Sequence, residues 1–325
     1  MEFNHDKDVE TINKTPEESN INFSETGSTD LVEEQIDDNL DNKLNDINIK
    51  NNIKTINEVP EYMKQDYLTE YVTCNNHREC ILNLFSFHRE SVNAWTMLLS
   101  VLSVILVSFY IIIKFKTNIV FSTILILHCI AYLCHFPFSF SYHTFFTLDV
   151  KEHLKWRKYD VYGILLRSIV LSFTLSFFTY KDIKTVILNT LLTLFVVVKS
   201  IEYFEKQNTS DKPLDKYNQG KLVGLVVLSF NIPVLYNLYN CIKNKNYDLS
   251  FKLSLLIIFT IFVFGGLYIF QYPDKLFEPG TFNKIGNHHN MMHVGVIILG
   301  VLEILYIFSM AKSNNYIRSF SKKIN

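Results

Sequence analysis

The chain of 325 residues lacks several features that mark secreted or redox-active proteins. Its five cysteines form no CxxC pair and no disulfide framework, so redox chemistry is not indicated. The N-terminus lacks the basic stretch and apolar core of a signal peptide, and we therefore expect the first spanning helix to direct membrane insertion. Neither an internal repeat nor a coiled-coil heptad is present. Glycine is also scarce, with 10 residues against 27 phenylalanines, which is unusual for a soluble globule.

Charge is divided unevenly along the chain. Residues 1–50 contain 14 Asp or Glu and 4 Lys or Arg, although the formal net charge of the whole chain is only −1. This segment is rich in Asn, Asp and Glu and has few aromatic residues, so it cannot bury enough apolar area to offset its chain entropy. The sequence therefore predicts a disordered acidic tail over 1–55, which we expect to bind a cytosolic partner.

Apolar segments long enough to cross a membrane recur through the rest of the chain. A spanning helix needs about 20 mostly apolar residues. Seven segments qualify, at about 96–113, 119–143, 159–180, 185–203, 222–239, 253–270 and 289–310. The sequence predicts an all-α membrane protein, with an interfacial segment over 56–95, a bundle of seven transmembrane helices over 96–311, and a short C-terminal tail over 312–325.

The odd number of spans places the two termini on opposite sides of the membrane. Each of the two longer loops on the N-terminal side contains four Lys or Arg residues, which favours a cytosolic N-terminus. Four basic residues in the C-terminal tail argue the other way. We predict a multi-pass integral membrane protein with its N-terminus in the cytosol, and the sequence does not identify the membrane.

Chemically notable residues are expected at one membrane face. Counting alternate crossings places the end of the second span and the starts of the third and seventh spans on the N-terminal side. His143 ends the second span, and His289 and His293 open the seventh at a spacing that puts both imidazoles on one helical face. Three histidines from two helices match a catalytic zinc site, which leaves one coordination position open. The alternative is that each histidine is structural.

Two further side chains lie near these histidines in the predicted arrangement. Asp160 opens the third span and is placed to hold the attacking water or to act as general base. Ser139 lies one turn before His143 on the same face, where it can orient a ligand or donate a hydrogen bond to a developing oxyanion.

Other ionisable residues lie deeper in the predicted spans. For His128 and His135, in the second span, we favour packing or a hydrogen bond over metal binding. A cation such as Arg167 inside a membrane is costly and often functional. Arg167 either pairs with Glu303 or contacts an anionic lipid group, and the sequence leaves both open. Pro137 should kink the second span, since it lacks an N–H.

At these positions the sequence resembles the progestin and adipoQ receptor family, which includes the adiponectin receptors and the haemolysin III proteins. The resemblance rests on three blocks: HRESVNAWTMLLS, SFSYHTF followed by KYDVYGI, and PDKLFEPGTFNKIGNHHNMMHV. Ser139 with His143 fits the SxxxH motif of the family, Asp160 its aspartate, and His289 with His293 its HxxxH motif. The resemblance implies seven spans, a cytosolic N-terminus and a zinc held by the three histidines, with Asp160 bound through water.

The resemblance leaves the activity open, since members are described as hormone or steroid receptors, lipid-amide hydrolases of the ceramidase type and pore-forming haemolysins. Our first hypothesis is a zinc-dependent hydrolase of a ceramide-like lipid amide, with Asp160 and Ser139 as catalytic residues and membrane lipids as partners. The alternative is a non-catalytic receptor or lipid sensor with a structural zinc. A haemolysin-type pore is the third hypothesis, although few charged residues line several spans at once. We expect no nucleic-acid partner.

Overall fold

The computed structural model describes residues 53–115, 117–207, 216–314 and 316–317. These residues belong to one compact unit. The predicted acidic tail at 1–55 lies outside the described residues except for its last three positions, and so does most of the predicted C-terminal tail at 312–325.

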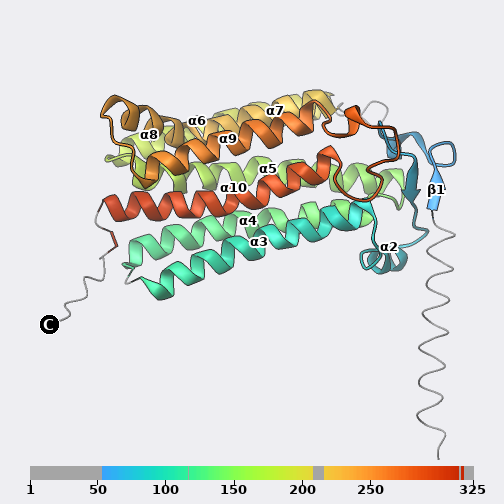
Figure 1. The fold of residues 1–325 in the computed structure, drawn as a ribbon, viewed down its shortest axis with the longest axis horizontal. Helices are drawn as coiled ribbons and strands as arrows, with labels where there is room; N and C mark the ends of the chain where they lie inside the picture. The colour runs from blue at the N-terminus through green and yellow to red at the C-terminus, as the bar shows by residue number, and fades with distance from the viewer. Residues whose placement is uncertain (1–52, 116, 208–215, 315, 318–325) are drawn as a thin grey trace, which may run out of the picture. The chain divides into compact units, whose positions relative to one another are not determined.

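Helices dominate the described residues (Figure 1). Before the first span lie an antiparallel pair of short strands, a 3-10 turn and a two-turn helix: β1 (Ile53–Thr55), η1 (Glu61–Met63), β2 (Glu70–Val72) and α2 (His77–Asn83). The register pairs Ile53 with Val72 and Thr55 with Glu70. The remaining elements are α3 (Arg89–Lys114), α4 (Ile119–Phe145), α5 (Val150–Thr179), α6 (Ile183–Gln207), α7 (Lys216–Phe230), α8 (Ile232–Lys243), α9 (Leu249–Ile269), η2 (Asp274–Leu276) and α10 (His288–Ser313).

The predicted seven-helix membrane fold is confirmed. Six helices (α3, α4, α5, α6, α9 and α10) are long and apolar enough to cross a membrane, and α7 with α8 forms a seventh span that is bent by 54°. The break falls at Asn231, just before Pro233 in the first turn of α8. Proline removes one backbone donor and its ring clashes with the preceding turn, which explains why the predicted fifth span is two helices. In contrast, α4 continues as one helix through Pro137.

Two spans begin earlier than the apolar pattern predicts, because caps outside the apolar run set their starts. His88 caps α3 in a reciprocal arrangement with Ser91, so this helix begins at Arg89 rather than near 96. The side chain of Asp149 accepts a hydrogen bond from the N–H of Glu152 and starts α5 at Val150 rather than near 159. Such caps satisfy backbone donors that a helix start leaves open.

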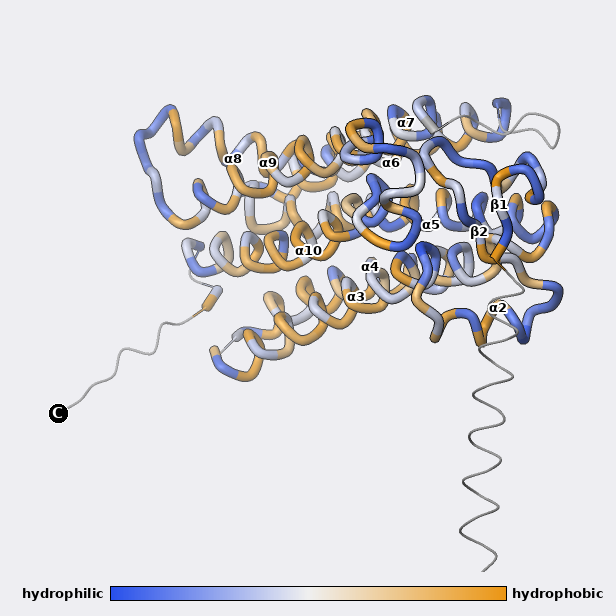
Figure 2. Tube along the Cα trace, turned by 45° about the vertical axis from the view of Figure 1, so that its right-hand side comes forward, coloured by the Kyte–Doolittle hydropathy of each residue, from blue (hydrophilic) through white to orange (hydrophobic). Residues whose placement is uncertain are grey.

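Figure 1 shows α5 between two groups of helices, with α3, α4 and α10 on one side and α6 to α9 on the other. Buried residues make up 56% of the apolar stretches of both α5 and α10, the highest share among the described spans. The starts of α3, α5, α7 and α10 and the ends of α4, α6 and α9 share one end of the bundle, next to the β-hairpin. Figure 2 shows hydrophobic residues along the helices and hydrophilic ones at their ends. We call the end near the hairpin the hairpin end.

Candidate metal centre

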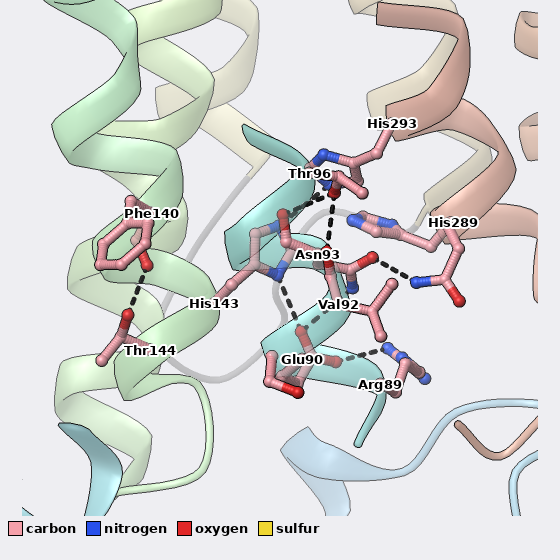
Figure 3. A network of polar contacts seen from close by, with 12 residues as sticks. Arg89, Glu90, Val92, Asn93, Thr96, Phe140, His143, Thr144, His289 and His293 are labelled. Atoms are coloured by element: carbon pink, nitrogen blue, oxygen red, sulfur yellow. Dashed lines mark hydrogen bonds and ion pairs between the residues drawn. The ribbon is translucent and has the colours of Figure 1, made fainter. Parts of the chain in front are cut away.

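Three histidines meet at the hairpin end of the bundle. His143 lies in the last turn of α4, and His289 and His293 lie in the first two turns of α10. Each offers one ring nitrogen, and these three atoms lie within 4.8 Å of one another. The imidazoles face each other between α4 and α10, with the start of α3 beside them (Figure 3). The structure thus brings the three predicted ligands into one group that can hold a metal ion.

The start of α10 is fixed by two side chains outside the histidine group. The side chain of Asn287 accepts hydrogen bonds from the N–H groups of His289 and Asn290. Asp274, in the loop before α10, accepts from both the backbone N–H and Nδ1 of His288, at 2.6 and 3.0 Å. His288 therefore binds Asp274, whereas its neighbour His289 belongs to the metal group. Burial raises the pKa of Asp274, but the bonds from His288 outweigh it and hold the pKa below its usual value.

A carboxylate from α3 orients His143. Oε2 of Glu90 lies 2.7 Å from Nδ1 of His143, and its other oxygen pairs with Arg89 at 2.9 Å. A carboxylate only accepts, so Nδ1 donates and the lone pair of a neutral His143 lies on Nε2. Asn93 donates to Glu90 and accepts from Asn290 of α10 at 2.6 Å. Together with the contact between Glu90 and His143, these bonds join α3, α4 and α10.

Sequence reasoning missed Glu90 as a site residue, although it lies in the block HRESVNAW. Glu90 and Asn93 are three residues apart at the start of an apolar run, and therefore on one helical face. Two polar residues on one face of a spanning helix were the available signal, because such groups need partners inside the bundle.

Two ring nitrogens of the histidine group have no hydrogen-bond partner among the described residues. Within the described residues, Nε2 of His289 and Nδ1 of His293 are buried and accept or donate no hydrogen bond. Nε2 of His143 lies 3.2 Å from Nε2 of His293. Two imidazole nitrogens this close need a shared proton or a cation near them, because their lone pairs repel. Orphaned buried nitrogens are unusual, and three imidazoles form a donor set typical of divalent transition metals.

Asp160 and Ser139 lie beside the histidine group. Nε2 of His135 lies 2.9 Å from Oδ1 of Asp160. The hydroxyl of Ser139 also lies within hydrogen-bonding reach of Asp160, and His143 is close enough to interact electrostatically with Asp160. Ser139 and His135 are buried one turn apart on α4, facing α5. The predicted catalytic pair therefore shares a hydrogen-bonded cluster with His135, for which the sequence favours packing or a hydrogen bond.

A chain of polar contacts continues from this cluster into the bundle. Arg167 lies 3.1 Å from Nδ1 of His135 and stacks over the Tyr132 ring. The Tyr132 hydroxyl donates to Oε2 of Glu303 at 2.9 Å, and Nε2 of His128 lies 3.3 Å from the same oxygen. Among the described residues, no carboxylate lies within ion-pair distance of Arg167. Arg167 and Glu303 thus meet through Tyr132, an arrangement that neither sequence alternative included.

The sequence model of the family described as Haemolysin-III related matches residues 85–303, more than half of the chain. The chain belongs to this family. The matched region begins just before α3 and ends within α10, so it contains all three histidines and Asp160. This match and the relatives below confirm the resemblance to progestin and adipoQ receptors and to haemolysin III.

Curated relatives of this haemolysin-III related chain come from animals and a plant. Membrane progestin receptor gamma-A of Danio rerio is 23% identical over 282 residues, which cover 75% of the chain and 78% of the relative. Adiponectin receptor protein of Drosophila melanogaster is 27% identical over 246 residues, covering 72% of the chain but only 53% of the relative. Heptahelical transmembrane protein 1 of Arabidopsis thaliana is 23% identical over 270 residues, covering 75% and 76%.

Proposed function

We propose that the chain is a zinc-dependent hydrolase that cleaves the amide bond of a ceramide-like membrane lipid. The observation that carries the proposal is the group formed by His143, His289 and His293, whose ring nitrogens lie within 4.8 Å of one another. A catalytic zinc takes three protein ligands and keeps a fourth position open, whereas a structural zinc is usually closed by four. Within the described residues, this group contains three ligands and no fourth.

The contacts of His143 favour a neutral imidazole with its lone pair on Nε2, which is the form that binds zinc. A zinc-bound imidazole is neutral and often donates its other N–H to a carboxylate, which raises its basicity. Glu90 occupies that position at Nδ1 of His143. The unpartnered Nε2 of His289 and the close approach of Nε2 of His143 to Nε2 of His293 also support a bound ion. Imidazole binds copper, nickel and iron as well, so metal analysis is part of the test.

The chain supplies groups for proton transfer beside the histidines. When bound, zinc would act as a Lewis acid and lower the pKa of water toward about 7. Asp160 would take the proton of the attacking water and pass it to the leaving amine. His135 orients Asp160: Arg167 can only donate to Nδ1 of His135, so Nε2 of a neutral His135 carries the proton and donates to Asp160. Ser139 would donate to the developing oxyanion.

A lipid substrate would reach the site sideways from the membrane. On the half of α9 nearest the hairpin end, Gly265 and Gly266 are partly exposed, and a Cβ added at either would meet no atom within 4 Å. Gly224 of α7 has the same open surroundings. These uncovered positions support entry along the lipid-facing side of α7 and α9 toward Tyr268, whose ring lies 5.6 Å from that of His289.

The test combines metal analysis with turnover. Detergent-purified protein is analysed for metal by mass spectrometry and incubated with ceramides and other lipid amides, whose free fatty acids are quantified. We expect about one zinc per chain, its loss in the His289→Ala, His293→Ala double variant, and normal content in His77→Ala, an exposed histidine of α2. Asp160→Asn should keep zinc and lose turnover by a factor of at least about 100. Zinc without turnover on any lipid amide would refute the hydrolase.

A receptor or lipid sensor with a structural zinc is the second proposal, and the names of two relatives, both receptors, favour it. In that case the metal would hold α4 to α10, and the acidic N-terminal segment would bind a cytosolic partner. Asp160→Asn separates the two proposals, because a purely structural site predicts a change in stability and no activity to lose.

A further inference from the structure

A groove of about 550 Å³ lies between α6 and α7, at the hairpin end of these helices. Its lining divides into polar residues, among them Lys199, Tyr203 and Lys221, and apolar residues, among them Phe195 and Leu225. The groove is separate from the metal centre, whose ligands come from α4 and α10.

The groove changes from polar to apolar along its length. α6 ends at the hairpin end and α7 begins there, so Phe195 and Leu225 lie deeper in the membrane than Tyr203 and Lys221. The eight-residue step from Phe195 to Tyr203 corresponds to about 12 Å at 1.5 Å per residue. Phe195 and Leu225 are 60% and 58% exposed, so the apolar part faces the lipid. This order matches a phospholipid, whose headgroup lies at the interface and whose chains point inward.

The charges of the lining favour an anion. Among the described residues, the lining contains two lysines and no Asp or Glu. Lys199 binds Glu202 at 2.8 Å, but both side chains are 58% exposed, and such pairs are weak. Lys221 lies over the Tyr217 ring, 3.9 Å from its centre. Both ammonium groups are therefore free to reorient toward a phosphate, and lysines at this depth attract anionic lipids.

The floor of the groove rests on a buried apolar cluster. Leu222 lines the groove and also belongs to a buried apolar cluster with Val161 and Leu165 of α5 and Val197 of α6. This cluster joins α5, α6 and α7 below the groove, so a lipid would bind without rearranging the backbones that carry the two lysines.

We propose that this groove binds one phospholipid with a net negative headgroup, taken from the leaflet at the hairpin end. Its phosphate lies between Lys199 and Lys221, and one acyl chain lies along Phe195 and Leu225. The site is independent of the proposed hydrolase, because it shares no residue with the histidine group.

Native mass spectrometry of the full chain in detergent tests the proposal by titration with phosphatidylserine and with phosphatidylcholine of the same acyl chains. We expect one tightly bound phosphatidylserine and weaker phosphatidylcholine. Lys199→Gln with Lys221→Gln should weaken phosphatidylserine binding about 30-fold, since each interfacial lysine contributes about a factor of five. Lys181→Gln with Lys184→Gln, an exposed pair at the opposite end, is the matched control and should bind normally.

Two further measurements test the proposal. The first distinguishes loss of positive charge from misfolding, and the second distinguishes binding of a whole lipid from binding of its headgroup alone. Lys199→Arg with Lys221→Arg keeps both charges and should keep phosphatidylserine binding; equal loss in this variant and in the glutamine variant would overturn the proposal. Water-soluble glycerophosphoserine should not compete at concentrations equal to those of the lipid. Full competition would show a headgroup site without an acyl chain and would also overturn the proposal, as would an unchanged lipid preference in the glutamine variant.

Discussion

Nδ1 of His143 lies 2.7 Å from a carboxylate oxygen of Glu90, and this contact joins α4 to α3 directly beneath the histidine group. Glu90 is buried and also binds Arg89, so its position is determined from two sides. The contact fixes which nitrogen of His143 is available as a ligand. Glu90 would therefore act on a bound metal through His143.

Replacing Glu90 should weaken metal binding without removing any ligand. We expect Glu90→Leu to lower zinc affinity by about 10- to 100-fold, because His143 loses the acceptor that fixes its tautomer and raises its basicity. Competition with a chromophoric chelator measures the affinity. Glu61→Gln, at an exposed position of η1, is the control and should leave it unchanged. Equal affinity in wild type and Glu90→Leu would contradict the role assigned to this contact.

Metal removal should destabilise the wild type selectively. An ion held by the three histidines would connect α4 with α10, and a ligand at about 1,000 times its dissociation constant adds about 4 kcal/mol of stability. We expect a chelator to lower the Tm of the wild-type protein. Unfolding in detergent is monitored by intrinsic fluorescence. The variant with His289→Ala and His293→Ala should unfold at one temperature with or without chelator. A wild-type Tm that stays constant after complete metal loss would rule out a stabilising metal.

Gly163 of α5 should tolerate no side chain. A Cβ at this position would lie 2.7 Å from Cδ2 of His135, so Gly163→Ala must displace the ring that orients Asp160. We expect overpacking to lower the free energy of unfolding of Gly163→Ala by about 1–3 kcal/mol. Turnover should fall while the zinc content stays normal. Gly224→Ala is the matched helical control, since nothing lies within 4 Å of its added Cβ. Equal Tm values for the two variants would contradict this prediction.

The contact between Asp274 and His288 should depend on pH. The pKa of Asp274 is lowered in the folded protein, so its ionised form stabilises the fold above the unfolded-state value of about 3.9. That contribution is lost as the pH falls from about 4 through the lower folded-state pKa. Asp274→Asn should lower the free energy of unfolding by about 1.5–3 kcal/mol at pH 7. The measurement is the decrease in Tm.

The difference in Tm between wild type and Asp274→Asn should narrow only below about pH 4. Glu278→Gln, an exposed carboxylate in the same loop, should have no effect at any pH. A difference that stays constant down to pH 3 would show that the carboxylate charge of Asp274 is not the stabilising feature.

The membrane spans were predictable because their signal is local. A segment that crosses lipid must satisfy its own backbone and present about 20 apolar residues, so length and composition suffice. The helix starts were less accurate, since Asp149 begins α5 in a charged stretch that no apolar pattern marks. The break at Asn231 also escaped prediction, although Pro233 was visible in the sequence.

The sequence by itself determined the fold class and the positions of His143, His289 and His293 at one membrane face, because crossing parity and helical spacing are properties of the chain. Only the tertiary structure decided which side chains meet. The bonds from Glu90 to His143 and from His135 to Asp160 depend on how each helix is rotated and packed against its neighbours. Rotation and packing come from complementary surfaces distant in sequence, which spacing within one helix does not specify.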